Sequence, residues 1–228
     1  MVGDFKDRAE AGRQLAPAVV RLGLVHPLGH PLVLALPRGG VPVAAEVARA
    51  LRAPLDLLIV RKIGAPGQPE LAVAAMRAEI EQRCTTYRRG CARLGVAGKT
   101  VVVVDDGIAT GSTVRAALQA LRRMRPARLV LAVPVAPADT LSELSPLVDD
   151  VVCLSQPAFF RSIGTYYADF HQVDDEEVIA LLDAAAARME HEPAARALQS
   201  RELPWVPLNG SDPSMDLRGP LRGSWRRS

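Results

Sequence analysis

The sequence predicts an α/β fold in which parallel strands form a central sheet. Short apolar runs of strand length alternate along the chain with longer segments of helical periodicity, as in consecutive β–α–β units. Val101 to Val104 are four successive β-branched residues, the composition of a strand that is buried on both faces of a parallel sheet. A strand with one solvated face would alternate apolar and polar residues instead.

The elements follow one another in a regular order. A first helix is predicted over Asp7–Leu22, where Pro17 bends or interrupts it and the apolar residues face the sheet. The predicted strands are Pro31–Leu36, Leu55–Val60, Val101–Val104, Arg128–Val133 and Val148–Leu154. The other predicted helices are Val41–Leu51, one that begins near Ser112, and the amphipathic segment Asp174–Arg188.

Length and composition indicate one domain and a tail. The chain has 228 residues, of which 49% are hydrophobic and 23% charged, enough for a sizeable core. We expect the domain to cover residues 1–190. Residues 191–228 are rich in Pro, Gly, Ser and Arg, with Trp205 and Trp225 as large aromatics, so a poorly ordered tail is predicted there.

Several classes of protein are disfavoured by the composition. No apolar stretch is long enough to cross a bilayer, and Met1–Glu10 mixes acids and bases where a signal peptide would be apolar. The net charge of +3 comes without a basic stripe interleaved with aromatics, so nucleic acid is not an expected partner. These features predict a cytoplasmic protein with neither membrane nor nucleic-acid binding.

Cysteine and histidine spacing argues against a protein-held metal and a disulfide framework. Cys84, Cys91 and Cys153 lack CxxC spacing and are expected to be reduced thiols. The four histidines are scattered without the spacing of metal ligands, and no GxSxG sequence marks a hydrolase.

The run VVVVDDGIATGST, residues 101–113, carries the strongest functional signal. Asp105 and Asp106 follow a buried strand, and ligand crevices of open α/β sheets lie outside the carboxyl ends of their strands. The next turn, Gly107–Thr113, offers backbone N–H groups and a helix N-terminus to an anion. Carboxylates only accept hydrogen bonds, so the pair suits neighbouring sugar hydroxyls. The run therefore predicts a site for a phosphorylated sugar with a free diol, whose phosphate is bound by Ala109, Thr110, Gly111, Ser112 and Thr113.

A second anion site is predicted where an earlier strand ends, at Leu36–Gly40. The adjacent glycines Gly39 and Gly40 permit conformations that other residues avoid and expose N–H groups, while Arg38 adds a permanent planar cation. Arg61 and Lys62 close the following strand and add positive charge at the same sheet edge.

These motifs resemble those of type I phosphoribosyltransferases. Residues 101–113 are similar to the phosphoribosyl-diphosphate (PRPP) motif of that family. The stretches 34–51, 55–72 and 162–178 resemble a bacterial group of phosphoribosyltransferases whose acceptor is generally unassigned. The resemblance implies a doubly wound parallel sheet with a small hood, here truncated, over the acceptor.

The resemblance also implies a reaction. PRPP with Mg²⁺ would donate a phosphoribosyl group to a nitrogenous acceptor with release of diphosphate, and Asp105 and Asp106 would fix the ribose. Arg38, Gly39, Gly40, Arg61 and Lys62 would hold the diphosphate, and Phe159, Ile163 and Tyr166 would contact the base. Ala109 stands where 6-oxopurine enzymes carry an acidic residue, which argues against hypoxanthine or guanine as acceptor.

One departure from the family leaves two functions open. Residues 70–75 run almost directly into 76–93, so part of the flap and of the hood is missing. Since flaps exclude water from the reacting centre, their loss could preserve binding and weaken turnover. The leading hypothesis is a phosphoribosyltransferase, and the alternative is a non-catalytic module that senses PRPP or a nucleotide. The oligomeric state stays open, with a homodimer among the options.

Overall fold

A computed structural model describes residues 4–24, 31–59 and 95–199, with side chains up to residue 190. Its centre is a five-stranded parallel sheet in the order β2-β1-β3-β4-β5. The strands are β1 (Leu32–Ala35), β2 (Leu55–Leu57), β3 (Thr100–Val104), β4 (Arg128–Val135) and β5 (Asp150–Ser155). The helices are α1 (Arg8–Val20), α2 (Gly40–Leu51), α4 (Ser112–Arg123), α5 (Ala138–Leu144) and α6 (Asp175–Gln199), with the 3-10 turns η1 (Ser145–Leu147) and η2 (Ile163–Tyr166).

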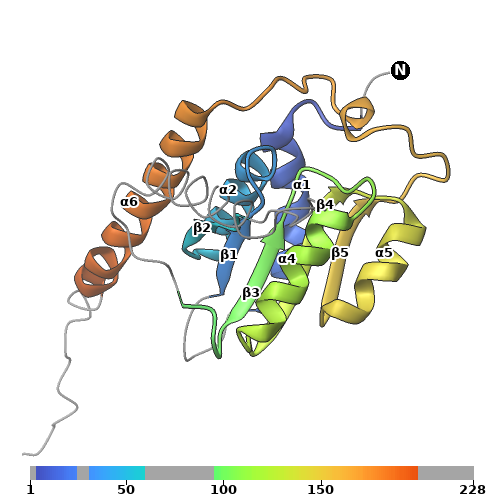
Figure 1. Ribbon diagram of the computed structural model, residues 1–228. Helices are drawn as coiled ribbons and strands as arrows, with labels where there is room; N and C mark the ends of the chain where they lie inside the picture. The colour runs from blue at the N-terminus through green and yellow to red at the C-terminus, as the bar shows by residue number, and fades with distance from the viewer. Residues whose placement is uncertain (1–3, 25–30, 60–94, 200–228) are drawn as a thin grey trace, which may run out of the picture.

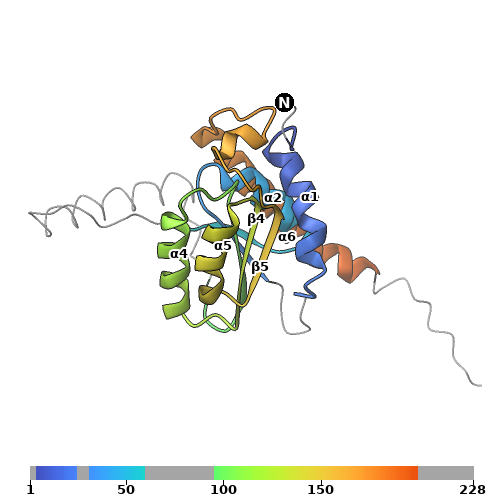
Figure 2. The ribbon, with the colours of Figure 1, turned by 90° about the vertical axis from the view of Figure 1, so that its right-hand side faces the viewer.

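Helices cover both faces of the sheet (Figures 1 and 2), so the predicted doubly wound arrangement is confirmed. Successive side chains of β3 point to opposite faces, as in any strand. Val102 and Val104 pack with the apolar residues of α1, α2 and α6, whereas Val101 and Val103 pack with those of α4 and α5. All four valines are fully buried, which explains the unbroken apolar run in the sequence.

The strand order reverses between β1 and β3. From β1 the chain passes through α2 to β2 on one side, and from β3 it passes through α4 to β4 and then to β5 on the other. The carboxyl ends of β1 and β3 therefore border the topological switch point, where ligands bind in open α/β sheets. Both motifs singled out in the sequence follow these two strands.

Some element boundaries differ from the predicted ones. β4 continues through Pro134 to Val135, and α5 and the two 3-10 turns were not predicted. Helix α6 extends to Gln199, past the predicted domain border at residue 190 and into the predicted tail. The tail prediction rested on the Pro, Gly, Ser and Arg content of this end of the chain, but the Ala- and Leu-containing residues directly after Pro193 have high helix propensity.

The N-terminal residues and the segment 156–174 are joined above the sheet. This segment follows β5, contains η2, and runs over the end of the sheet to which the strand arrows point (Figure 1). Phe5 donates its N–H to the Tyr166 carbonyl at 2.9 Å and accepts from the Ala168 N–H at 2.8 Å. Among the described helices, none combines the length and the apolar composition needed to cross a membrane.

Candidate functional site

The loops after β1 and β3 touch at the switch point. A Cβ added to Gly39 would collide with Oδ2 of Asp106 and lie 2.7 Å from its Cγ. A Cβ on Gly40 would lie 2.8 Å from the carbonyl oxygen of Val104 and 2.9 Å from the Cα of Asp105. The two motifs predicted separately from the sequence thus lie in contact as one candidate site, and glycine is needed in the first because the second passes so close.

The two carboxylates of this site have different surroundings. Asp106 is buried, and its Oδ2 accepts a hydrogen bond from Nε of Arg8 at 2.8 Å. Its carbonyl oxygen accepts from the hydroxyl of Tyr167 at 2.5 Å. Asp105 is partly exposed, and its Oδ1 accepts from the N–H of Asp106 at 2.9 Å. Asp105 is therefore the more accessible of the pair, and Asp106 is the more firmly held.

Burial acts on both carboxyl groups, and each also has a charged neighbour. Desolvation raises the pKa of Asp105 well above its ordinary value, and the neighbouring charge of Asp106 raises that pKa further. Desolvation also raises the pKa of Asp106, but the hydrogen bond and charge of Arg8 oppose that rise. Both carboxylates would therefore gain from a ligand that brings hydroxyl donors or positive charge to them.

The turn before α4 has the form of an anion-binding loop. Gly111 caps the helix with a φ of +68°, a region that favours glycine, and a Cβ there would lie 2.8 Å from Cγ2 of Thr140. The Thr140 hydroxyl donates to the Ala109 carbonyl at 3.1 Å and fixes the turn from α5. Within the described residues, the N–H groups of Ala109, Thr110 and Gly111 donate to no backbone carbonyl. Helix geometry leaves those of Ser112 and Thr113 unpaired as well.

The loop Arg38–Gly40 differs in part from the prediction. Nη1 of Arg38 lies 3.4 Å from Oδ1 of Asp175 at the start of α6, and the Pro37–Arg38 peptide bond is cis. The sequence analysis expected a backbone conformation that only glycine adopts readily. Gly39 instead has an ordinary helical φ of −59°, so its conformation does not require glycine. The Gly40 N–H donates to the Leu36 carbonyl at 3.0 Å. Gly40 therefore offers space to a neighbour rather than a donor to an anion, and the expectation of an exposed N–H there was wrong.

The predicted base-contact residues do not form one wall. Phe159 is exposed, Tyr166 stacks on Phe160 with ring centroids 5.6 Å apart, and Ile163 packs on Gly107. A Cβ on Gly107 would lie 2.7 Å from Cγ2 of Ile163, so this side chain meets the loop that carries the acidic pair. Of the three predicted residues, Ile163 is the one in contact with the rest of the site.

Some predicted residues lie outside the described part of the chain. These are Arg61 and Lys62, the shortened flap region after Ala75, Cys84, Cys91 and both tryptophans. Cys153 is described and is a free, half-buried thiol, as expected. Among the described residues, no three His, Cys, Asp or Glu side chains gather so that they could hold a metal ion.

The structure adds two residues that sequence reasoning missed. Arg8 reaches Asp106 from the first turn of α1, across 98 positions of the chain, and Thr140 supports the anion loop from α5. Neither stands in a motif, and an arginine that begins a surface helix looks like a solvated cation. Only the spatial pairing reveals them.

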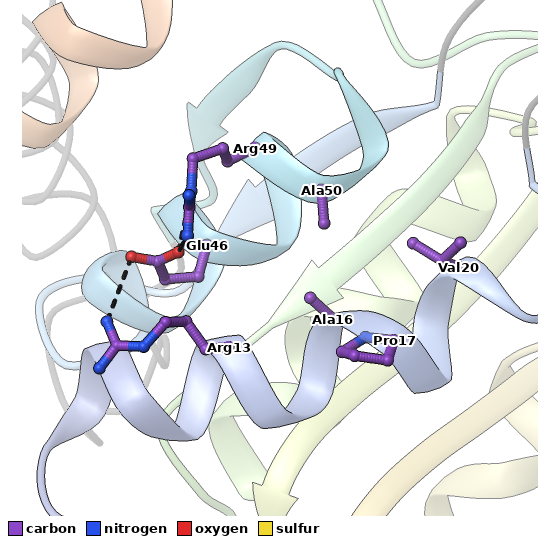
Figure 3. Close-up of a pocket in the computed structure, with 7 residues that line it drawn as sticks. All are labelled: Arg13, Ala16, Pro17, Val20, Glu46, Arg49 and Ala50. Atoms are coloured by element: carbon purple, nitrogen blue, oxygen red, sulfur yellow. Dashed lines mark hydrogen bonds and ion pairs between the residues drawn. The ribbon is translucent and has the colours of Figure 1, made fainter.

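A separate groove lies between α1 and α2 and contains none of the site residues (Figure 3). Its volume is about 370 Å³, and apolar side chains line one end of it. At the other end, Glu46 pairs with Arg49 on α2 and lies 3.6 Å from Nη1 of Arg13 on α1. The ion pair between Arg13 and Glu46 links the two helices across this groove, which is not part of the switch-point site.

Comparison with known proteins agrees with this geometry. The family model of the phosphoribosyl transferase domain matches residues 13–170. A Mycobacterium tuberculosis protein, provisionally named a phosphoribosyl transferase, is 43% identical over 212 aligned residues, which cover 79% of this chain and 47% of that protein. The chain thus spans about half the length of the curated relatives that it matches.

Two further relatives match different shares of the chain. The crystal structure of TT1426 from Thermus thermophilus is 40% identical with a TM-score of 0.71, and the match covers 80% of this chain and 98% of that one. The adenine phosphoribosyltransferase of Mycobacterium avium is 35% identical over 98 residues, 43% of this chain and 52% of that protein. From the domain match and these identities, together with two glycine-containing loops that meet at the switch point of a parallel sheet, we conclude that the chain belongs to the phosphoribosyl transferase family.

Proposed function

We propose that this protein transfers a phosphoribosyl group from PRPP, with Mg²⁺, to a nitrogenous acceptor and releases diphosphate. The observation that carries the proposal is the contact of Gly39 with Asp106, because it joins the loop that carries the cation Arg38 to carboxylates suited to a sugar diol. The turn that follows the two aspartates, in which Gly111 caps α4, is suited to a second phosphate group. A sugar with phosphates at both ends matches this order of groups.

Each part of the site has a proposed role. The free N–H groups of residues 109–113 bind the 5′-phosphate, and Asp105 and Asp106 accept hydrogen bonds from the two ribose hydroxyls. Arg38 exchanges its contact with Asp175 for the diphosphate oxygens, which carry more charge. Arg61 and Lys62 are proposed to add positive charge to the diphosphate site.

The proposed chemistry breaks one bond at the anomeric carbon and forms another. The bond from that carbon to the diphosphate oxygen breaks with its electron pair leaving on the diphosphate, while a ring nitrogen of the acceptor supplies the pair for the new C–N bond. The transition state has the character of an oxocarbenium ion, as in other glycosyl transfers. The carboxylates under the ribose offset the positive charge that develops there.

Mg²⁺ would neutralise charge on the leaving diphosphate. This hard cation prefers oxygen ligands and keeps several waters, so the diphosphate and ribose oxygens of PRPP form a suitable donor set. The protein then binds the metal through the ligand that it holds, and the residues named above act on the ligand.

The acceptor is proposed to react without an acidic residue in the anion loop. Ala109, whose methyl group can neither donate nor accept a proton, occupies the position before Thr110 and Gly111. Adenine-type acceptors fit this arrangement better than 6-oxopurines. The similarity to an adenine phosphoribosyltransferase over 98 residues supports the same class.

Calorimetric titration of PRPP with Mg²⁺ into the full chain tests the proposal. We expect a micromolar dissociation constant, about −8 kcal/mol of binding free energy. The double variant Asp105→Asn, Asp106→Asn should bind less tightly by about 1.5 to 3 kcal/mol, because it loses charged hydrogen bonds. Asp183→Asn, an exposed aspartate on α6, is the matched control and should bind as the wild type does.

Diphosphate release in a screen of purine and pyrimidine acceptors then separates a transferase from a PRPP sensor. Release with one acceptor, lost in the double variant, supports transfer. Tight binding without release from any acceptor supports the sensing module, and no binding at all removes both functions. Small soluble substrates also suit the expected cytoplasmic location.

A further inference from the structure

Arg8 is an unusual arginine because it is almost completely buried. Its relative exposure is 7%, and its Nε donates to Oδ2 of Asp106 at 2.8 Å. Nη1 donates to the carbonyl oxygen of His171 at 2.7 Å, and the guanidinium carbon lies 3.8 Å from the ring centre of Phe170. A buried cation is costly unless it is paired and hydrogen-bonded, and these three contacts meet that need.

The surrounding chain fixes Arg8 in this position. Asp7 caps α1 by accepting from the N–H of Glu10 at 2.7 Å, so Arg8 begins a well-formed helix. Phe5 is buried against Tyr167, and the backbones around them are hydrogen-bonded to each other. Tyr167 in turn bonds to the carbonyl of Asp106. The carboxylate and the backbone of Asp106 are thus both held from outside the β3 loop.

The charges around Asp106 make Arg8 the main group that favours its ionised form. The groups that face it are Asp105 from its own loop, Arg8 from α1 and the hydroxyl of Tyr167 from the segment 156–174. Arg8 is the cation in this set, and burial is what favours the protonated form of Asp106. A protonated carboxyl loses acceptor capacity that sugar hydroxyls would use.

We propose that Arg8 is a positioning residue of the phosphoribosyl site, which holds one oxygen of Asp106 and supplies the positive charge that keeps the carboxylate an acceptor for the ribose. The inference rests on the function proposed above. It assigns a role to the N-terminal segment, which lies before the residues matched by the family model. A carboxylate has two oxygens, so the single bond from Nε leaves acceptor capacity for a ligand.

The variants Arg8→Met and Arg8→Lys test this role in the full chain. Met keeps much of the apolar stem without charge, and Lys keeps the charge without the planar fork. Arg13→Met is the matched control, because Arg13 lies on the same helix, is 49% exposed, and faces Glu46 in the groove of Figure 3. Urea unfolding of each variant establishes that it is folded, and Arg8→Lys serves if Arg8→Met does not fold.

The first measurement needs no ligand. Carbon-13 NMR follows the side-chain carboxyls of Asp105 and Asp106 through a pH titration, with Asp106→Asn to assign the signals. The Asp106 titration should move to higher pH in Arg8→Met, move less in Arg8→Lys, and stay unchanged in Arg13→Met. An unchanged titration in a folded Arg8→Met protein overturns the inference, since Arg8 would then be a structural tie only.

The second measurement is PRPP affinity, with Mg²⁺, at pH 6, 7 and 8.5. Arg8→Met should bind at least about tenfold less tightly at pH 6, because a charged hydrogen-bond network is lost, and the deficit should shrink as rising pH ionises Asp106. A deficit that is the same at every pH contradicts the proposed role. If the wild type binds no PRPP although the NMR shift is present, the proposed function fails and this role falls with it. If the wild type binds and Arg8→Met binds equally well, this inference alone fails.

Discussion

Gly39 and Asp106 lie so close together that a side chain at residue 39 would displace the carboxylate. Asp106 cannot move aside easily, since Arg8 holds its Oδ2 and Tyr167 holds its carbonyl. The loop after β1 and the loop after β3 are thereby packed as one unit. This contact, between residues 67 positions apart, is what turns two sequence motifs into a single candidate site.

Gly39→Ala should therefore damage both stability and binding. The added methyl overpacks a tight contact, which lowers the free energy of unfolding by about 1 to 3 kcal/mol. Urea denaturation measures this loss, and PRPP titration should show weaker binding. Gly95→Ala is the control, since a Cβ at Gly95 would meet no atom within 4 Å. Equal stability of the two variants would show that the β1 loop adapts more freely than its packing indicates.

Gly111→Ala should destabilise the anion loop through its backbone. A positive φ of 68° costs an alanine about 1 to 2 kcal/mol relative to glycine, and the new methyl would also press on Cγ2 of Thr140. Adding Thr140→Ser removes that methyl contact and keeps the hydroxyl, so the double variant should recover part of the loss. Denaturation of both variants measures the two contributions, and no recovery in the double variant would rule out the steric part.

Tyr167→Phe should lower the free energy of unfolding by about 1 to 3 kcal/mol, because it leaves the buried Asp106 carbonyl without its hydroxyl donor. The neighbouring Tyr166→Phe makes a good comparison. The Tyr166 hydroxyl is 3.5 Å from the Phe159 carbonyl in an exposed setting, so its loss should change stability very little. A similar effect of both changes in urea denaturation would mean that the Tyr167 bond is no stronger than a surface contact.

Asp105→Asn should make the protein more stable at neutral pH while it weakens ligand binding. Because the pKa of Asp105 is raised in the folded state, this group favours folding most below its ordinary pKa of about 4 and disfavours folding progressively as the pH rises through the folded-state pKa. Asparagine does not titrate, and its Oδ1 can still accept from the Asp106 N–H.

Urea midpoints of wild type and Asp105→Asn between pH 4 and 8 check this expectation. The advantage of the variant should be largest near pH 8 and disappear toward pH 4. The exposed Asp183→Asn should show no such trend. An advantage that does not vary with pH would mean that the carboxylate charge is not what destabilises the site.

The sheet could be predicted from local patterns because its signals are local. Unbroken apolar runs such as Val101–Val104 report burial on both faces, and each predicted strand corresponds to a strand of the structure. Boundaries were less accurate at two places where the regular structure continues through a proline. Pro134 lies within β4, and Pro193 lies within α6, although both residues usually interrupt regular structure.

The proximity of some candidate site residues could be predicted for the same reason. Asp105, Asp106 and the turn that begins α4 occur in one continuous run, so their proximity follows from the chain itself. For Gly39 and Gly40, the sequence indicated that glycine mattered and suggested the wrong reason. Their φ angles do not require glycine. The space left by the loop after β3 does, because that loop passes so close that a Cβ would collide with it.

The sequence by itself determined the strand and helix pattern, the acidic pair at a strand end and the glycine-capped turn before α4, because each depends on residues that are close together in the chain. Only the tertiary structure decided that Asp106 is buried and Asp105 partly exposed. It also decided that Arg8 and Tyr167 hold Asp106, and that Thr140 supports the turn before α4. Those relationships depend on desolvation and on contacts between distant segments, which exist only after the sheet, α1 and the segment 156–174 have packed together.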